Sequence, residues 1–284
     1  FLNPVHETEV FDLVNNFKNK KSAGYDGLSN SCLKQIIPEI IKPLTYIFNL
    51  SISSGTFPQK MKLAKVVPIF KKGDSLNVSN YRPISLLTSI SKFLEKLVYS
   101  RTMKFLQDKN VFCKTQLGFR ENHSTSHAIL TFIDKVARAT DHYSHTVGVF
   151  LDFSKAFDTI NHDILLYKLS HYGIRGLALK WFQSYLHSRQ QFVRISNSDS
   201  SIKTLGTGVP QGSILGPLLF ILYINDFCNS SKLLSFLLFA DDSNIFYSHH
   251  DPQYLLDTLN AELLNVTDWI KSNKLSLNFD KTNF

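Results

Sequence analysis

The first part of the chain alternates between helical and strand-like spacing of its apolar residues. The stretches with helical spacing are 6–17, 29–53 and 91–106. Residues 62–70 lie between them and are rich in Val and Ile, so they predict a short strand. We therefore expect a helical lead-in over residues 1–60 and a region of mixed structure from residue 61 onward.

The second half of the chain continues this mixture of patterns. The expected strands are 146–151, 190–196, 202–205, 233–239 and 243–248. The expected helices are 163–172, 176–186, 213–227 and 252–271. No internal repeat or long flexible linker interrupts these elements, so the pattern indicates a mixed α+β fold in one continuous body.

Three aspartates stand where expected strands end. Asp241 and Asp242 form the tip of the hairpin expected over 233–248, and Asp152 follows the strand expected over 146–151. Aspartate is common in turns, which explains an isolated pair without any chemistry. If the strands pair side by side, however, the three carboxylates converge and repel one another unless cations bind. Three carboxylates holding two Mg²⁺ about 4 Å apart form the arrangement that nucleotidyl transfer requires.

Short motifs that include these aspartates occur in a defined order. Residues 151–158 read Leu-Asp-Phe-Ser-Lys-Ala-Phe-Asp, residues 208–217 read Gly-Val-Pro-Gln-Gly-Ser-Ile-Leu-Gly-Pro, and residues 239–242 read Phe-Ala-Asp-Asp. In this order they resemble the palm motifs of reverse transcriptases from LINE-type, jockey-like non-LTR retrotransposons. The flanking blocks that also match are 80–87, 116–120, 123–125, 273–278 and 281–282. The resemblance therefore covers most of the chain.

The resemblance implies a right-hand polymerase fold over residues 61–284. The fingers would occupy about 61–145, and the palm, an antiparallel sheet backed by helices, about 146–284. The thumb would be missing, because it would lie beyond Phe284. The chain starts with Phe rather than Met and stops abruptly, so we expect a fragment of a longer polypeptide.

The same resemblance assigns the metal-binding residues. Asp152 and Asp241 would be the principal ligands, with Asp242 beside them and the backbone of Phe153 completing the site. The implied cofactor is a pair of Mg²⁺ ions, with Mn²⁺ as the alternative ion. Lys281 matches the lysine of the motif after the catalytic hairpin and would act as a general acid for pyrophosphate.

Five further residues are expected at the nucleotide. Phe157 falls where reverse transcriptases place an aromatic gate against the ribose 2′-hydroxyl, although core packing is the alternative role of such a Phe. Gln211 and Gly212 match a motif that lies against the incoming nucleotide, and an ordinary Gly-Pro turn is the alternative there. Arg82 and Lys71 would direct cations at the triphosphate, although a solvated surface also explains the lysine.

The composition is consistent with a nucleic-acid partner. Lys and Arg outnumber Asp and Glu by 31 to 23, which gives a net charge of +8 and favours polyanions. The three cysteines lie far apart without a CxxC spacing, so neither a disulfide framework nor a zinc site is indicated. The longest strongly apolar run, 217–224, is much shorter than the roughly 20 residues of a membrane helix. We expect an intracellular protein, and the resemblance adds a nuclear location.

Together these patterns predict an RNA-directed DNA polymerase. It would extend a DNA primer on an RNA template from deoxynucleoside triphosphates, as part of a retrotransposon polyprotein. One alternative is an RNA-directed RNA polymerase, which shares the palm carboxylates but needs room for a 2′-hydroxyl at Phe157. The other is an inactive or domesticated fragment that binds nucleic acid without extending it.

Overall fold

The computed structural model describes residues 2–196 and 198–284, which form two compact units. The first unit contains the described residues up to Asn110 together with Leu165–Gly216. The second unit contains Val111–Ile164 and Pro217–Phe284. Each unit is thus built from two separate segments of the chain. The sequence predicted a helical lead-in up to residue 60, fingers over about 61–145 and a palm over about 146–284. That division of the chain stays a prediction, separate from these two units.

Four helices lie wholly within the first unit. They are α1 (Glu7–Asn16), α2 (Asn30–Ser54), α3 (Ser89–Asp108) and α6 (Gly176–Leu186), and α5 (His162–His171) leads into this unit. The buried Trp181 of α6 donates its indole N–H to the Ser51 hydroxyl of α2 at 3.0 Å. The ring of Trp181 also stacks on Tyr185 and meets the edge of Phe57. The Trp181 contacts therefore hold α6 against α2 and the residues after it, and both segments are helical as their spacing predicted.

The first unit also contains a five-stranded sheet. Its strands are β1 (Leu63–Phe70), β2 (Tyr81–Leu86), β4 (Arg189–Ile195), β5 (Ser198–Asp199) and β6 (Lys203–Leu205). The path runs β2-β1-β4-β5, with β6 also paired to β4; β1 and β4 are parallel and the other pairs antiparallel. Strand β2 was not predicted from the sequence, and it contains Pro83. Proline is tolerated there because β2 forms the edge of the sheet.

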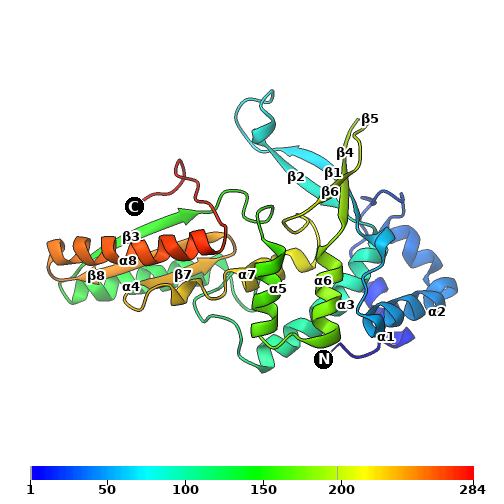
Figure 1. Cartoon of the computed structure of the whole chain (residues 1–284), viewed down its shortest axis with the longest axis horizontal. Coiled ribbons are helices and arrows are strands. Elements are labelled where there is room, and N and C mark those ends of the chain that lie inside the picture. Colours follow the sequence, from blue (N-terminus) through cyan, green and yellow to red (C-terminus); the bar gives the residue numbers. More distant parts are fainter. Residues whose placement is uncertain (1, 197) are drawn as a thin grey trace. The chain divides into compact units, whose positions relative to one another are not determined.

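The second unit is organised around a three-stranded antiparallel sheet. Strands β3 (His145–Asp152), β8 (Asp242–His249) and β7 (Ser235–Phe239) follow the order β3-β8-β7 (Figure 1). In this register Asp152 lies directly opposite Asp242. The expectation of a mixed α+β fold with an antiparallel sheet is therefore confirmed, and the sheet brings together residues that are 90 positions apart in sequence.

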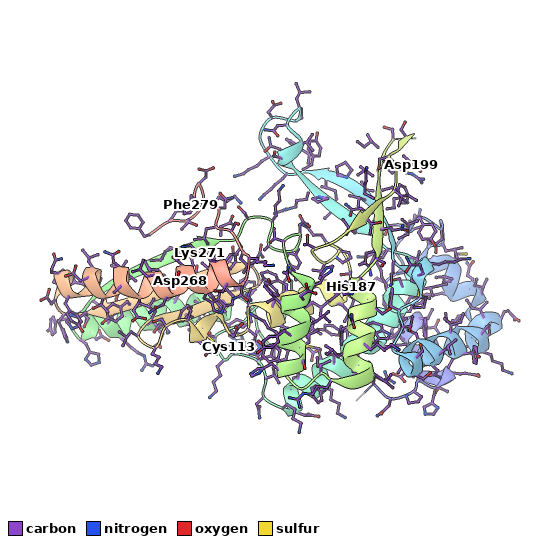
Figure 2. All side chains as sticks on the ribbon, viewed as in Figure 1. Cys113, His187, Asp199, Asp268, Lys271 and Phe279 are labelled. Atoms are coloured by element: carbon purple, nitrogen blue, oxygen red, sulfur yellow. The ribbon has the colours of Figure 1, made fainter. Side chains whose placement is uncertain are left out.

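Helices cover both faces of this sheet (Figure 1). Helix α8 (Pro252–Ser272) packs on β8 and directs charged residues such as Asp268 and Lys271 to solvent (Figure 2). Helix α4 (Thr125–Asp141) lies on the opposite face, where Phe132 contacts the rings of Phe150 and Phe246. The helices therefore back the sheet on two sides.

Helix α7 (Leu215–Tyr223) is shorter than the helix predicted over 213–227. Its central residues are fully buried, and the chain continues from it into a short 3-10 helix, η3 (Phe227–Asn229). The sequence did not indicate where α7 ends, because a buried helix and a buried turn are both rich in apolar residues. Among the described residues, none of the helices combines the length and the apolar character needed to cross a bilayer.

Candidate active site

The β7–β8 hairpin turns through only two residues, Ala240 and Asp241. Phe239 pairs with Asp242 across the hairpin, so Asp242 is the first residue of β8 rather than part of the tip. Ala240 has a φ of +58°, a left-handed backbone that glycine usually supplies in such a turn. The tip therefore holds Asp241 in a strained two-residue turn that other contacts must stabilise.

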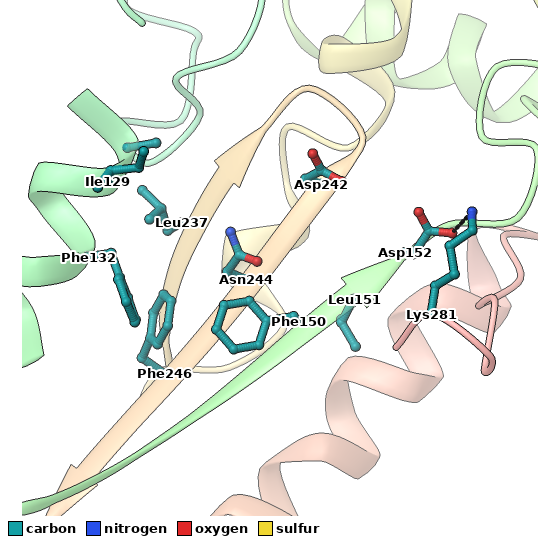
Figure 3. Close-up of a pocket in the computed structure, with 11 residues that line it drawn as sticks. Ile129, Phe132, Phe150, Leu151, Asp152, Leu237, Asp242, Asn244, Phe246 and Lys281 are labelled. Carbon is teal, nitrogen blue, oxygen red and sulfur yellow. Dashed lines mark hydrogen bonds and ion pairs between the residues drawn. The ribbon is translucent and has the colours of Figure 1, made fainter. Parts of the chain in front are cut away.

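The carboxylates gather at the end of the ladder that β3 and β8 form. Asp152 is the last residue of β3 and lies opposite Asp242, and both side chains project on the same face of the sheet (Figure 3). Burial, followed by the negative charges of Asp241 and Asp152, raises the pKa of the Asp242 carboxyl, while Lys281 opposes this effect. The three aspartates thus act on one another electrostatically.

Lys281 lies in contact with this group. Its Nζ donates to Asp152 Oδ2 at 3.0 Å (Figure 3), and the lysine side chain is 47% exposed. The segment that carries Lys281 runs along the free edge of β3, since the backbone N–H of Asn278 donates to the Asp152 carbonyl at 2.8 Å and Asn283 exchanges hydrogen bonds with Phe150. Backbone pairing therefore brings the lysine to the carboxylates.

The donor atoms at this site suit a hard divalent cation. Among the described residues, no group of three or more His, Cys, Asp and Glu side chains has the arrangement of a metal site. Burial first, and then the negative charges of Asp241 and Asp152, raise the pKa of Asp242, and a bound cation would relieve the repulsion among these carboxylates. Carboxylate oxygens are the ligands that Mg²⁺ prefers, so the residues present fit this ion.

A cavity of about 430 Å³ lies beside the carboxylates on the same face of the sheet. Its polar wall includes Asp152, Asp242, Asn244 and Lys281, and its apolar wall includes Ile129, Phe132, Phe150 and Phe246 (Figure 3). The hollow therefore combines anionic groups with aromatic surface in one unit of the protein.

The two phenylalanines of the first motif have different surroundings. Phe153 is buried, and its ring meets the edge of Phe227 at 6.0 Å, while its backbone lies opposite Leu277. Phe157 is half-buried, and one face of its ring stacks on Phe220 at a centroid distance of 4.9 Å. One face of the Phe157 ring therefore packs against Phe220. The predicted gate would use the part of the ring that stays exposed.

The remaining predicted residues lie in the other unit. Arg82 on β2 and Lys71 after β1 are exposed. The loop that contains Gln211 is tied to β2, because Ser85 N–H donates to the Gln211 carbonyl at 2.7 Å. At Gly212, with a φ of +122°, a Cβ atom would lie 2.6 Å from the Ser85 carbonyl oxygen, so only glycine fits. The loop of Gln211 is thus attached at Ser85 to the strand that carries Arg82.

Two buried polar residues contact these motifs although they were not assigned a role from the sequence. Gln116 has no exposed surface and accepts a hydrogen bond from the hairpin tip at Ala240. Glu95, also fully buried, accepts the N–H groups of Ile214 and Leu215 at 2.7 and 3.3 Å. The sequence offered one signal for Glu95, which is a single acidic residue on the apolar face of a helix.

Comparison with known proteins agrees with the motif order. Residues 69–284 match the family described as "Reverse transcriptase (RNA-dependent DNA polymerase)". The chain is 30% identical over 295 residues to the "Probable RNA-directed DNA polymerase from transposon BS" of Drosophila melanogaster, covering 99% of this chain and 32% of that protein. It is 34% identical over 226 residues to the "RNA-directed DNA polymerase from mobile element jockey" of the same species, covering 79% of this chain and 25% of that protein.

A third relative comes from another genus. The chain is 29% identical over 241 residues to the "Retrovirus-related Pol polyprotein from type-1 retrotransposable element R1" of Bradysia coprophila, covering 84% of this chain and 23% of that protein. The chain spans about a third of the length of the first relatives that it matches. The expected resemblance to enzymes of non-LTR elements is confirmed, and the chain belongs to the reverse transcriptase family.

Proposed function

We propose that this chain is an RNA-directed DNA polymerase that extends a DNA primer on an RNA template from deoxynucleoside triphosphates. The observation that carries the proposal is the pairing of Asp152 with Asp242 at the end of an antiparallel sheet, next to the strained tip that holds Asp241. Membership of the reverse transcriptase family makes nucleotidyl transfer the chemistry that such carboxylates serve.

The aspartates would hold two Mg²⁺, with Mn²⁺ as a substitute. Asp152 and Asp241 are the proposed principal ligands, with Asp242 beside them and the backbone of Phe153 completing the set. When bound, these ions activate the primer 3′-hydroxyl and neutralise the pyrophosphate leaving group. Lys281, at 3.0 Å from Asp152, is the proposed proton donor to that leaving group.

Residues on or near β1 and β2, and residues of the loop that contains Gln211, would contact the nucleotide. Arg82 and Lys71 supply exposed positive charge for the triphosphate, and Arg82 does so with the forked geometry that suits phosphate oxygens. Gln211 and Gly212 would lie against the nucleotide, in a loop that backbone contact with Ser85 holds beside β2.

The wider setting is also part of the proposal. Residues from about 61 to 145 would form the fingers and those from about 146 to 284 the palm of a right-hand polymerase. The chain would work within a retrotransposon polyprotein bound to its RNA, and its site of action would be the nucleus. The net charge of +8 is consistent with a nucleic-acid partner.

Primer extension tests this function directly. The purified chain is supplied with an RNA template, a labelled DNA primer, deoxynucleoside triphosphates and Mg²⁺. We expect extension by the unchanged chain, and a loss of at least about a hundredfold in Asp241→Ala, equivalent to about 3 kcal/mol of transition-state stabilisation.

The control is Asp268→Ala, which removes an exposed aspartate on the solvent face of α8 and should leave the rate unchanged. Equal incorporation by the chain and by Asp241→Ala would contradict the proposal. Salt-dependent RNA binding without any extension would instead favour the binding-module alternative.

Phe157→Ala is expected to weaken the preference for deoxynucleotides by about tenfold to a hundredfold, because it opens space for the 2′-hydroxyl. The measurement is the ratio of kcat/KM for a deoxynucleotide and its ribonucleotide counterpart. Phe279→Ala is the matched control, since that ring is 81% exposed in the same unit.

If Phe157 serves core packing instead of a gate, the expected result of Phe157→Ala differs. In that case Phe157→Ala would lower the melting temperature through the lost stacking on Phe220 and leave nucleotide selectivity unchanged. Efficient ribonucleotide use by the unchanged chain would favour an RNA polymerase.

A further inference from the structure

A short segment ahead of α4 pairs with the catalytic hairpin. The backbone N–H of Leu238 donates to the Thr115 carbonyl at 2.9 Å, and the N–H of Leu117 donates to the Leu238 carbonyl at 2.8 Å. This is a single parallel bridge on the outer edge of β7. The side chain of Leu117 then packs with Leu237 and Phe246, so the bridge is anchored in the apolar core of the same unit.

The side chain of Gln116 extends this contact to the tip itself. It is fully buried, and its Oε1 accepts hydrogen bonds from the N–H of Gly118 at 2.8 Å and from the N–H of Ala240 at 3.3 Å. Ala240 is the residue with the left-handed backbone and directly precedes Asp241. One amide oxygen therefore joins the segment to the strained residue of the tip.

This arrangement leaves the amide nitrogen of Gln116 unsatisfied in the described part of the chain. Its Nε2 is buried, and it has no hydrogen-bond partner among the described residues. A flipped amide would place the NH₂ group against two N–H donors, so only the observed orientation satisfies the backbone. A buried donor without a partner is costly, and such a group is retained where its other atom performs a task.

Gly118 adds a steric constraint at the same point. A Cβ atom there would lie 1.9 Å from the backbone nitrogen of Ala240 and 2.7 Å from its Cα, a distance that no side chain could occupy without moving the tip. The contact is with backbone, which cannot swing aside as a flexible side chain can. The two residues together form a clamp, which we define as Gln116 and Gly118.

We propose that the clamp of Gln116 and Gly118 is a positioning device for the polymerase reaction, holding Asp241 in the orientation that the catalytic metals need. The inference rests on the proposed function, because the clamp matters for chemistry only if the aspartates perform it. The residues of the clamp contact the hairpin backbone and not the reacting atoms, so they act through Asp241. Displacement of a catalytic group by about 1 Å can lower a rate a hundredfold.

The first experiment compares Gln116→Met with Gln116→Glu. Methionine keeps the length of the side chain and removes the acceptor, whereas a protonated glutamate keeps an acceptor oxygen. We expect Gln116→Met to lower kcat in primer extension by about tenfold to a hundredfold and Gln116→Glu to recover part of that loss. The dissociation constant for primer–template should change by less than about twofold, because no nucleic-acid contact is removed.

The steric half of the clamp is tested by Gly118→Ala against Gly206→Ala. A Cβ at Gly206 meets no atom within 4 Å, so this control introduces the same methyl group without a clash. We expect Gly118→Ala to reduce kcat at least as strongly as Gln116→Met, and Gly206→Ala to behave like the unchanged chain.

A second readout does not depend on activity. Hydrogen–deuterium exchange of a peptide that covers residues 236–242 reports the N–H of Ala240, which Gln116 protects. We expect faster exchange of that peptide in Gln116→Met while peptides from β3 stay protected. Unchanged exchange in Gln116→Met would overturn the clamp even in an active enzyme. An unchanged kcat, or a loss of kcat equal to the unfolded fraction, would also overturn its positioning role.

These outcomes separate the two proposals. If the unchanged chain fails to extend a primer, the proposed function fails, while faster exchange in Gln116→Met still supports the physical clamp on the hairpin. If the chain extends a primer and the clamp variants are as active as it is, the proposed function stands and the inference fails.

Discussion

Asp152→Asn is expected to lower the rate of primer extension by about a thousandfold, or about 4 kcal/mol of transition-state stabilisation, while the fold stays intact. Asparagine has the size of aspartate but lacks the charge that a divalent ion requires. The position lies opposite Asp242, so the change also removes one of the negative charges that raise the pKa of that carboxyl. Activity and stability should therefore respond in different ways.

The stability forecast follows from two small effects of opposite sign. Loss of the exposed ion pair with Lys281 costs between 0 and about 1 kcal/mol, and relief of repulsion with Asp242 offsets part of it. Asp134→Asn is the matched control, because Asp134 forms a similar exposed pair with Arg138 in the same unit. Both variants should unfold within about 1 kcal/mol of the unchanged chain, and only Asp152→Asn should lose activity.

A titration of Asp242 completes this test. Its carboxyl pKa should fall in Asp152→Asn and stay where it is in Asp134→Asn, which carboxyl-detected NMR can measure. A chain that keeps most of its extension rate after Asp152→Asn would remove the basis of the proposed chemistry.

The carboxylate end of the sheet illustrates what local sequence can predict. Apolar runs predicted strands over 146–151 and 243–248, with Asp152 at the end of the first and Asp241 and Asp242 at a hairpin tip before the second. The sequence left open whether these strands are neighbours and in which register they pair. In the structure, β3 pairs with β8 in the register that places Asp152 opposite Asp242.

Helix α4 shows where such prediction stops. None of its residues is buried, and Ile129 and Leu130 are more than half exposed, so its apolar residues do not mark a core face. Its packing against the sheet depends on Phe132, a contact between elements that hydropathy alone does not specify. The interleaving of the two units was equally hidden, because it arises from long-range contacts.

Gln116 and Glu95 were missed for a related reason. Each is a polar side chain whose partner is the backbone of a distant segment, Ala240 in one case and Ile214 in the other. Backbone N–H groups are the same in every sequence, so composition and spacing carry no trace of the pairing. Only the fold reveals which buried polar residue satisfies which turn.

Glu95 is the position where loss of a side chain should destabilise the protein most. Its Oε2 accepts the N–H groups of Ile214 and Leu215 at the start of α7, and its Oε1 accepts the Ser91 hydroxyl at 3.3 Å. The positive charge of Arg189, which is 1% exposed, also acts on this carboxyl. Glu95 thus caps a helix and is a carboxyl on which a buried positive charge acts.

Glu95→Leu is expected to lower the free energy of unfolding by about 3–5 kcal/mol, since it leaves two N–H groups and the buried Ser91 hydroxyl without their acceptor. The measurement is equilibrium denaturation followed by Trp181 fluorescence in a Trp269→Phe background, which reports the first unit alone.

The double variant Glu95→Leu with Arg189→Met separates the lost charge pair from the lost cap. It removes both charges, so the part of the cost due to the uncompensated cation should return, while the unsatisfied N–H groups remain. A double variant as unstable as the sum of the single ones would show that the charges do not interact.

The pH dependence of this site has a definite sign. Burial raises the pKa of the Glu95 carboxyl above its ordinary value, against the opposing effects of Arg189 and the two N–H groups. The folded state therefore binds the proton more tightly than the unfolded state, and the stability that this contributes is present at low pH and is lost as the pH rises through the folded-state pKa. Glu95→Gln keeps an acceptor and cannot ionise, so its stability relative to the unchanged chain should increase from acid toward neutral pH. A difference that moves in the opposite direction would mean that the N–H groups and Arg189 outweigh burial, and a constant difference would mean that they balance it.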